Sequence, residues 1–322
     1  RSAASAAIAM LALAGCSAIV ETRNDTRATA ARDAYPPLGS FVMVDGRRVH
    51  YVQEGSGPDL VLLHGASGNL RDWTFDFVDR VKDRYRVTAF DRPGLGYTDG
   101  NPDYAGAFDA RAEGPQAQAR LLKAAARALG IDREIVLGHS YGGAVAMAWA
   151  LDHDPAAAVI VSGATQPWPG GLGVMYTFTG TSLGGGLVVP LISAFVPKSL
   201  ARRAIASVFA PQDPPPGYAE YVGAGLTLRP DSFRTNAQQV KSLRPELVRM
   251  SGRYPSLDLP LEIVHGTADD VVPLDIHSEK LAAQVPGAVL TRLDGIGHMP
   301  HHAAPEAVAA AIDRAAARAG LR

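Results

Sequence analysis

The sequence lacks several features that would each define a class of protein. Its 322 residues include one cysteine, Cys16, so the chain can form no internal disulfide. The formal net charge is -1, with no basic excess to indicate nucleic-acid binding and no acidic block typical of a disordered tail. The apolar stretch 187–196 is too short for a transmembrane helix, and Pro190 interrupts it. With 47% hydrophobic residues, the chain can still bury the core of one large domain.

The N-terminal segment has the pattern of an export signal. It starts with Arg1, continues through small and apolar residues, and reaches the sequence LAGC at Cys16. LAGC resembles the bacterial lipobox, whose cysteine becomes the lipidated first residue. We expect a signal peptide over 1–16 and a lipid anchor at Cys16, with an ordinary signal peptide as the alternative. Ser17 favours an exported lipoprotein at the outer membrane or periplasmic face.

Residues 17–37 are polar, rich in alanine and arginine, and without periodicity, which predicts a flexible tether. The chain has no initiator methionine, so we expect the natural sequence to begin further upstream.

Strand-like and helix-like patterns alternate after the tether, which predicts an α/β fold with a layered sheet and right-handed crossovers. Short apolar runs predict strands at 41–44, 49–52, 60–63, 86–90, 135–137, 158–161, 261–264 and 289–293. Helical spacing of apolar residues occurs at 70–83, 116–129 and 305–319. Clusters of glycine and proline change the pattern over 163–258, which indicates an inserted lid between core segments 38–162 and 259–320.

The sequence GHSYG at 138–142 lies between a predicted strand and a predicted helix, the arrangement of a nucleophile elbow. Glycines on either side let the strand and helix pass closely, and the serine is held in a strained conformation. Ser140 would project at the helix N-terminus, where unpaired N–H groups favour developing negative charge. The motif predicts Ser140 as a nucleophile.

A serine nucleophile needs a base and a group that orients the base. Asp269 and Asp270 follow the strand at 261–264, and His298 follows the strand at 289–293 in a loop rich in glycine and proline. Because active sites of open α/β sheets lie at the carboxyl ends of strands, these groups can converge on Ser140. The backbone N–H groups of Ala66 and Tyr141 would form the oxyanion hole.

These motifs together resemble the α/β-hydrolase family over nearly the whole chain, from 41 to 319. The matching segments are GHSYG, LLHGASGNLRDW, DRPGLGY, HGTADDVVP and GIGHMPHH, in the family's Ser, Asp, His order. The resemblance implies a mostly parallel eight-stranded sheet, a helical cap at 163–258 and Asp269 rather than Asp270 as the acid. Epoxide hydrolases and haloalkane dehalogenases of this fold carry aspartate at the elbow, so Ser140 argues against both activities.

The sequence therefore predicts a serine hydrolase that cleaves a small or medium carboxylic ester through Ser140, His298 and Asp269, with no cofactor or metal. Alternatives are a cofactor-free haloperoxidase or perhydrolase, a carbon–carbon bond hydrolase, and a lipoprotein that uses the fold only for binding. Neither the substrate nor a protein partner can be inferred from the residues. The only other partner expected is the membrane, through Cys16.

Several further residues have structural interpretations. Asp91 is expected to act as a hydrogen-bonding partner and His64 to brace the oxyanion loop. We interpret His301 and His302 as solvated loop residues rather than metal ligands. Trp168, Tyr176 and Phe178 in the lid either line the acyl pocket or serve in packing.

Overall fold

The computed structural model describes residues 2–322, with side chains from residue 15 onward except that of Lys198. Its centre is one eight-stranded sheet in the order β1-β2-β4-β3-β5-β6-β7-β8. Strand β2 is antiparallel to β1 and β4, and the other neighbouring pairs are parallel. The strands are β1 Ser40–Val44, β2 Arg47–Glu54, β3 Asp59–Leu63, β4 Arg86–Phe90, β5 Ile135–His139, β6 Ala157–Val161, β7 Leu261–Gly266 and β8 Val289–Leu293. The predicted mostly parallel eight-stranded α/β-hydrolase sheet is confirmed.

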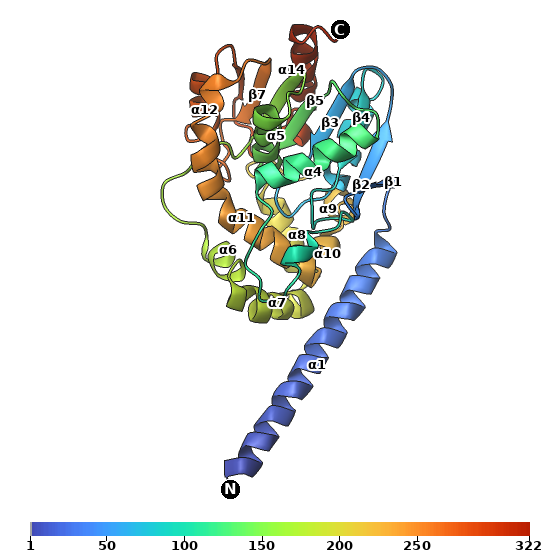
Figure 1. The fold of residues 1–322 in the computed structure, drawn as a ribbon, viewed down its shortest axis with the longest axis vertical. Helices are drawn as coiled ribbons and strands as arrows, with labels where there is room; N and C mark the ends of the chain where they lie inside the picture. Colours follow the sequence, from blue (N-terminus) through green and yellow to red (C-terminus); the bar gives the residue numbers. More distant parts are fainter. Residues whose placement is uncertain (1) are drawn as a thin grey trace.

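Helices cover both faces of the sheet (Figure 1). In β3, Val61 and Leu63 belong to one core cluster, whereas Leu60 and Leu62 belong to the other. The first cluster includes residues of α4 (Pro115–Ala128) and α5 (Tyr141–Asp152), and the second includes α3 (Phe77–Val81) and α14 (Pro305–Arg318). A strand buried on both faces reads as a continuous apolar run, which is why β3 and β6 could be recognised from sequence.

One predicted helix is interrupted in the structure, and another forms unbroken after an additional short turn. The helix expected over 70–83 is divided into α2 (Arg71–Thr74) and α3, because Asp76 takes a non-helical φ of -156°. The helix expected over 305–319 is preceded by a separate turn, α13 (Pro300–Ala303), and Ala304 between them has φ -144°. The proline at the start of each of these last two segments suits the first turn of a helix.

The cap follows the carboxyl end of β6, and the chain returns from it through α11 (Pro230–Ser251) to the start of β7. Its helices are α6 Val174–Thr179, η2 Gly184–Val188, α7 Val189–Phe195, α8 Lys198–Ser207, α9 Tyr218–Tyr221, α10 Ala224–Thr227 and α11 Pro230–Ser251. The remaining short elements are η1 Pro102–Tyr104, η3 Tyr254–Ser256 and α12 Ser278–Gln284. Figure 1 shows α6 and α7 at the end of the globular part opposite the C-terminus, with α1 extending beyond them.

The N-terminal segment forms one helix, α1, from Ser2 to Ala34. The prediction of a flexible tether over 17–37 is therefore wrong for 17–34, while Arg1, the start of the predicted signal peptide, lies outside the described residues. Alanine is a strong helix former, and one side of α1 packs on the cap through the buried residues Asn24, Ala28 and Ala31. Sequence patterning missed this stripe because its members are small or polar.

Within the described residues, no single helix is both long enough and apolar enough to cross a membrane. One bent pair, Gly184–Phe195 with Ser199–Ser207, satisfies the length and composition criteria together.

Candidate active site

Ser140 lies at the sharp turn from β5 into α5, with φ 54° and ψ -119°. This strained conformation is possible because the neighbouring glycines remove side chains that would clash. A Cβ on Gly138 would lie 2.1 Å from the carbonyl oxygen of Gly142, and one on Gly142 would lie 2.3 Å from that of Leu63. The turn therefore has the backbone geometry of a nucleophile elbow, with Ser140 at the N-terminus of a twelve-residue helix.

Asp269 is fixed by several hydrogen bonds in the loop after β7. Its Oδ1 accepts the backbone N–H groups of Val271 and Val272, both at 2.9 Å. Its Oδ2 lies 2.8 Å from His298 Nδ1 and 3.1 Å from His265 Nε2. Burial alone would raise the pKa of the Asp269 carboxyl, but hydrogen bonds from His265, His298 and Val272 outweigh it and lower the pKa well below its usual range. The carboxylate is thus held ionised.

His298 is oriented from both sides. Because Asp269 accepts from Nδ1, that nitrogen carries the proton, and Nε2 keeps the lone pair that a general base needs. The ring of His139, the residue preceding Ser140, donates from Nε2 to the carbonyl oxygen of His298 at 2.9 Å. The two imidazole centroids are 4.8 Å apart. Among the described residues, Ser140 Oγ makes no hydrogen bond to the ring of His298, a contact that often tightens only when substrate binds.

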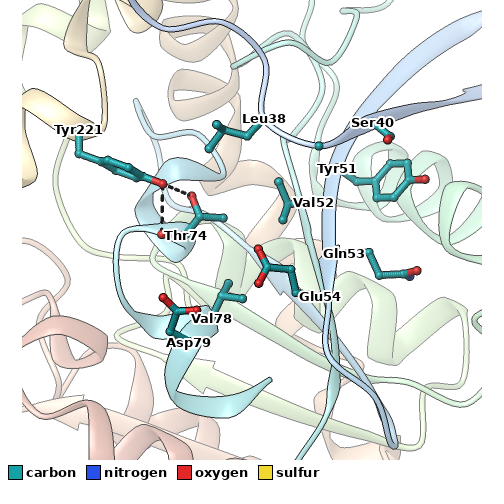
Figure 2. A pocket seen from close by; sticks show the side chains of 11 residues that line it. Leu38, Ser40, Tyr51, Val52, Gln53, Glu54, Thr74, Val78, Asp79 and Tyr221 are labelled. Carbon is teal, nitrogen blue, oxygen red and sulfur yellow. Dashed lines mark hydrogen bonds between the residues drawn. The ribbon is translucent and has the colours of Figure 1, made fainter. Parts of the chain in front are cut away.

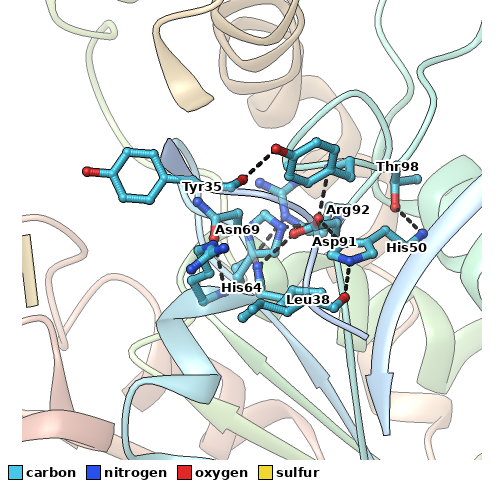
Figure 3. Close-up of polar contacts among 12 residues, drawn as sticks. Tyr35, Leu38, His50, His64, Asn69, Asp91, Arg92 and Thr98 are labelled. Carbon is cyan, nitrogen blue, oxygen red and sulfur yellow. Dashed lines mark hydrogen bonds and ion pairs between the residues drawn. The ribbon is translucent and has the colours of Figure 1, made fainter. Parts of the chain in front are cut away.

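The loop after β3 lies against the elbow and is braced by buried polar groups. A Cβ on Gly65 would be 3.1 Å from the Cβ of Ser140. Arg92 donates from Nε to the carbonyl oxygen of His64 at 2.8 Å and from Nη2 to that of Gly65 at 2.9 Å. Figure 3 shows His64 and Arg92 side by side in this network. Burial, reinforced by the charge of Arg92, lowers the pKa of His64 to about 4. The imidazole is therefore neutral, and its Nε2 accepts the backbone N–H of Arg92.

Asp91 is a structural hydrogen-bonding centre, as predicted. It accepts the N–H groups of Leu70 at 2.7 Å and Tyr97 at 2.8 Å, and His50 Nδ1 lies 2.6 Å from it (Figure 3). These contacts connect the loops after β3 and β4 with β2. The contact with Leu70 helps to hold the loop after β3 in place.

His301 and His302 are buried, so the interpretation of solvated loop residues is wrong. Their Nε2 atoms lie 3.1 Å and 2.8 Å from the two oxygens of Asp72, which also accepts the hydroxyl of Tyr218 at 2.7 Å. Asp72, His301 and His302 are donor types that could hold a metal, with ligand atoms within 4.8 Å of one another. Here the contacts form a hydrogen-bonded cluster that connects the His298 loop to α9 of the cap.

Sequence reasoning missed His139, His265 and Asp72. His139 and His265 each lie within a predicted motif at the end of a strand, but the motifs alone assigned them no role. Asp72 is surrounded in the sequence by residues of a predicted helix, and nothing there shows that a distant histidine pair binds it.

Two cavities open elsewhere on the molecule. The first, of about 520 Å³, lies among β2, α3 and α9, where Tyr221 contacts Thr74 (Figure 2). The second, of about 1220 Å³, lies between α1, the cap and the loop at 94–113. Ser140 lines neither cavity and is 9% exposed. In the cap, Phe178 is 56% exposed, whereas Trp168 is partly buried against the core.

Comparison with known proteins places this geometry in a family. The profile described as "Alpha/beta hydrolase family" matches residues 60–311. Haloalkane dehalogenase 2 of Mycobacterium bovis is 26% identical over 280 residues, which cover 82% of this chain and 90% of that protein. An esterase from Rhodococcus sp. ECU1013 is similar over 85% of this chain and 96% of its own, at 26% identity and a TM-score of 0.62.

A solved membrane phospholipase A resembles an even larger part of the molecule. The similarity covers 98% of this chain and 97% of that one, with 22% identity and a TM-score of 0.66, and it concerns the fold. The family profile spans well over half of the residues, including the strand before Ser140 and the loops of Asp269 and His298. The chain belongs to the alpha/beta hydrolase family.

Proposed function

We propose that the protein is a serine hydrolase that cleaves a small or medium carboxylic ester, with Ser140 as nucleophile, His298 as base and Asp269 as the orienting acid. The observation that carries this proposal is the pairing of a strained serine elbow with a buried His298–Asp269 hydrogen bond of 2.8 Å. The similarity to an esterase at 26% identity also favours it.

In the proposed mechanism, Ser140 Oγ attacks the ester carbonyl carbon while His298 Nε2 takes its proton. The carbonyl oxygen becomes an oxyanion that accepts the N–H groups of Ala66 and Tyr141. Collapse expels the alcohol, which receives the proton from His298, and leaves an acyl-enzyme. His298 then takes a proton from water, whose oxygen attacks the acyl carbon, and the acid is released as Ser140 regains its proton.

The proposed oxyanion donors are available for this role. Within residues 2–322, the N–H groups of Ala66 and Tyr141 donate to no protein acceptor. Ala66 follows Gly65, which lies against Ser140, and Tyr141 begins α5. Removing one such donor typically costs about 10²–10³ in rate, so the preorganised pair supplies a large part of the expected catalysis.

The test is hydrolysis of p-nitrophenyl esters by Ser140→Ala beside Ser162→Ala. Ser162 is a suitable control because it is also buried, has φ 44° and follows the neighbouring strand β6. We expect Ser140→Ala to lose at least about 10³-fold in kcat/KM and the control to stay within about threefold of the native enzyme. Equal activity of the Ser140→Ala variant and the native protein would contradict the proposal.

The same protein should be tested for the alternative chemistries. Haloalkane dehalogenase 2 is a relative, yet a dehalogenase of this fold uses an elbow aspartate where this chain has Ser140. We therefore expect no halide release from chloroalkanes and no peroxide-dependent halogenation of a dye beyond background. Either activity at a rate above ester hydrolysis would favour that alternative.

We also propose that Cys16 carries a lipid anchor and that the protein is exported to the outer membrane or periplasmic face. The proposal is supported by LAGC at 13–16 and by the exposed position of Cys16 on α1, four residues before the partly buried Val20. Several acyl chains hold a protein stably on a bilayer, whereas one binds marginally. Cys16→Ser should move the protein from the membrane fraction to the soluble fraction, and unchanged membrane association would contradict the anchor.

A further inference from the structure

The cap carries a stripe of exposed apolar side chains along one continuous helical segment. The stripe consists of Leu183, Leu187, Leu191 and Phe195, which are 66%, 57%, 49% and 49% exposed. Leu183 has helical backbone angles and leads into η2, which continues directly into α7. A spacing of four residues is close to one helical turn, so these side chains follow one side of the segment.

The opposite side of the same segment is docked on the cap. Gly184, Gly185, Val189 and Ser193 are buried, and the carbonyl oxygen of Gly185 accepts Arg234 Nε at 3.1 Å. The segment 183–196 contains no charged residue, and Ser193, its one hydroxyl group, is on the buried side. The segment therefore contributes only apolar side chains to its exposed side.

Further exposed apolar residues lie on the adjoining helices. Val174, Met175 and Phe178 on α6 are 85%, 49% and 56% exposed, and Leu200 on α8 is 53% exposed. Together with the stripe they are eight of the fifteen large apolar side chains exposed in the described part of the chain. Such a concentration within 27 consecutive residues, 174–200, is typical of an interaction surface rather than of scattered exposure.

Helix α1 fixes the direction in which this surface faces. Asn24 donates to the carbonyl oxygen of Pro190 at 3.1 Å, and Arg27 donates to those of Ala194 and Val196 at 3.1 Å and 2.7 Å. These contacts hold α1 along α7, and α1 then continues past the cap toward its N-terminus (Figure 1). Cys16 lines the same surface hollow as Leu187 and Leu191.

We infer that the apolar cap stripe, Leu183, Leu187, Leu191 and Phe195, docks on a lipid bilayer. A lipid attached to Cys16 would enter the bilayer beside Leu187 and Leu191, which places the stripe at the same surface. A helical segment with one apolar face suits insertion into the interfacial layer without spanning it, although this one lacks the charged opposite face of a free amphipathic helix because the cap covers that side. The bilayer then supplies the apolar environment that the stripe lacks in water.

This surface also narrows the proposed substrate to an amphiphilic ester that is delivered at the bilayer. That part of the inference rests on the proposed esterase function, whereas the docking rests on the exposed stripe and on the proposed anchor at Cys16. Because the stripe is part of the cap, contact between the stripe and lipid would act on the element that we expect to control access to Ser140.

The docking is tested by placing a tryptophan in the stripe. Leu187→Trp is compared with Val248→Trp, since Val248 is similarly exposed at 54% and lies on α11 fourteen residues beyond Arg234, which bonds the segment of the stripe. Two of the three native tryptophans, Trp73 and Trp149, are fully buried, so brominated lipid cannot reach them and their emission stays constant. With the full chain on vesicles of brominated phosphatidylcholine, we expect at least half of the added emission to be quenched for Leu187→Trp and almost none for Val248→Trp.

Equal quenching at the two positions, or none at Leu187→Trp, would overturn the docking. A change in oligomeric state of Leu187→Ser/Leu191→Ser without lipid, combined with no quenching, would identify the stripe as a contact between copies and would also overturn it.

The substrate class is tested with the same double variant. We expect Leu187→Ser/Leu191→Ser to lose about fivefold or more in hydrolysis of a long-chain ester embedded in vesicles, with unchanged hydrolysis of p-nitrophenyl acetate in solution. An equal rate on the embedded ester would contradict the inferred substrate class. Failure of the native protein on both esters would instead refute the proposed function, and the quenching result would stand independently.

Discussion

The central strands of the core bury their apolar residues, whereas parts of the cap leave them exposed. Strands β5, β6 and β7 have every residue buried, whereas in α6 only Thr179 is buried among six residues. In the core, close packing of the elbow holds Ser140 in a strained backbone conformation, and hydrogen bonds hold Asp269 and His298. On α6 and along the apolar cap stripe, large apolar groups remain exposed and are available for another surface. The difference indicates that chemistry is fixed by the core and access by the cap.

The largest expected effect is the loss of the acid in the core. Asp269→Asn keeps the shape of the side chain but can no longer hold the charged form of His298, so kcat should fall by roughly 10³–10⁴-fold. The matched control is Asp270→Asn, which changes an exposed carboxylate one residue away and should stay within about threefold. Steady-state kinetics on one ester measure both, and equal losses would mean that the wrong aspartate has been chosen.

A second prediction contrasts one glycine from each region. Gly142→Ala adds a Cβ that would lie 2.3 Å from the backbone oxygen of Leu63, so the elbow must shift and the free energy of unfolding should fall by about 3 kcal/mol. Gly171→Ala in the cap meets no heavy atom within 4 Å and should change it by less than about 0.5 kcal/mol. Denaturant titration tests the pair, and similar values would show that the two regions are packed alike.

Acid should lower the free energy of unfolding through the buried neutral histidines. Burial lowers the folded-state pKa of His64, His277 and His301 from 6.5 to about 4. Between about pH 6.5 and 4 the unfolded chain binds protons that the folded chain does not, so stability falls as pH falls, by up to about 1.4 kcal/mol per pH unit for each histidine. His277 accepts the N–H groups of Thr165 and Gln166, where the cap begins.

Denaturant midpoints at several pH values measure this slope. His277→Gln should reduce this slope by the contribution of one histidine. A denaturant midpoint of the native protein that stays constant between pH 6.5 and 4 would contradict the presence of buried neutral imidazoles.

The smallest effect should come from an aromatic residue of the cap. Phe178→Ala removes a side chain that is 56% exposed and should cost less than about 0.5 kcal/mol of unfolding free energy. Phe90→Ala, at a fully buried position of β4, should cost about 3–5 kcal/mol. Comparable losses would show that Phe178 is packed in solution.

The core could be predicted from sequence because its strands are continuous apolar runs and its chemistry-bearing loops follow them directly. The eight predicted strands all occur, and β8 has the predicted ends at 289 and 293. The hydrogen bond between Asp269 and His298 also follows from two loops at neighbouring strand ends.

Other parts depend on contacts between distant segments that leave no local pattern. The helix over 17–34 is stabilised by alanines packed on the cap, and composition alone suggested a tether. His301 and His302 resemble loop residues in sequence, but Asp72, 229 and 230 residues away, gives each a buried partner. The apolar cap stripe was visible as an apolar run, yet its outward orientation required the structure.

Ser140 is proposed as the reacting nucleophile of the core. Treatment of the folded protein with a fluorophosphonate, followed by mass spectrometry of its peptides, tests this directly. We expect one adduct, on Ser140, that is lost when His298 is replaced by alanine. No adduct under conditions that label other serine hydrolases, or an adduct on another serine such as Ser162, would contradict it.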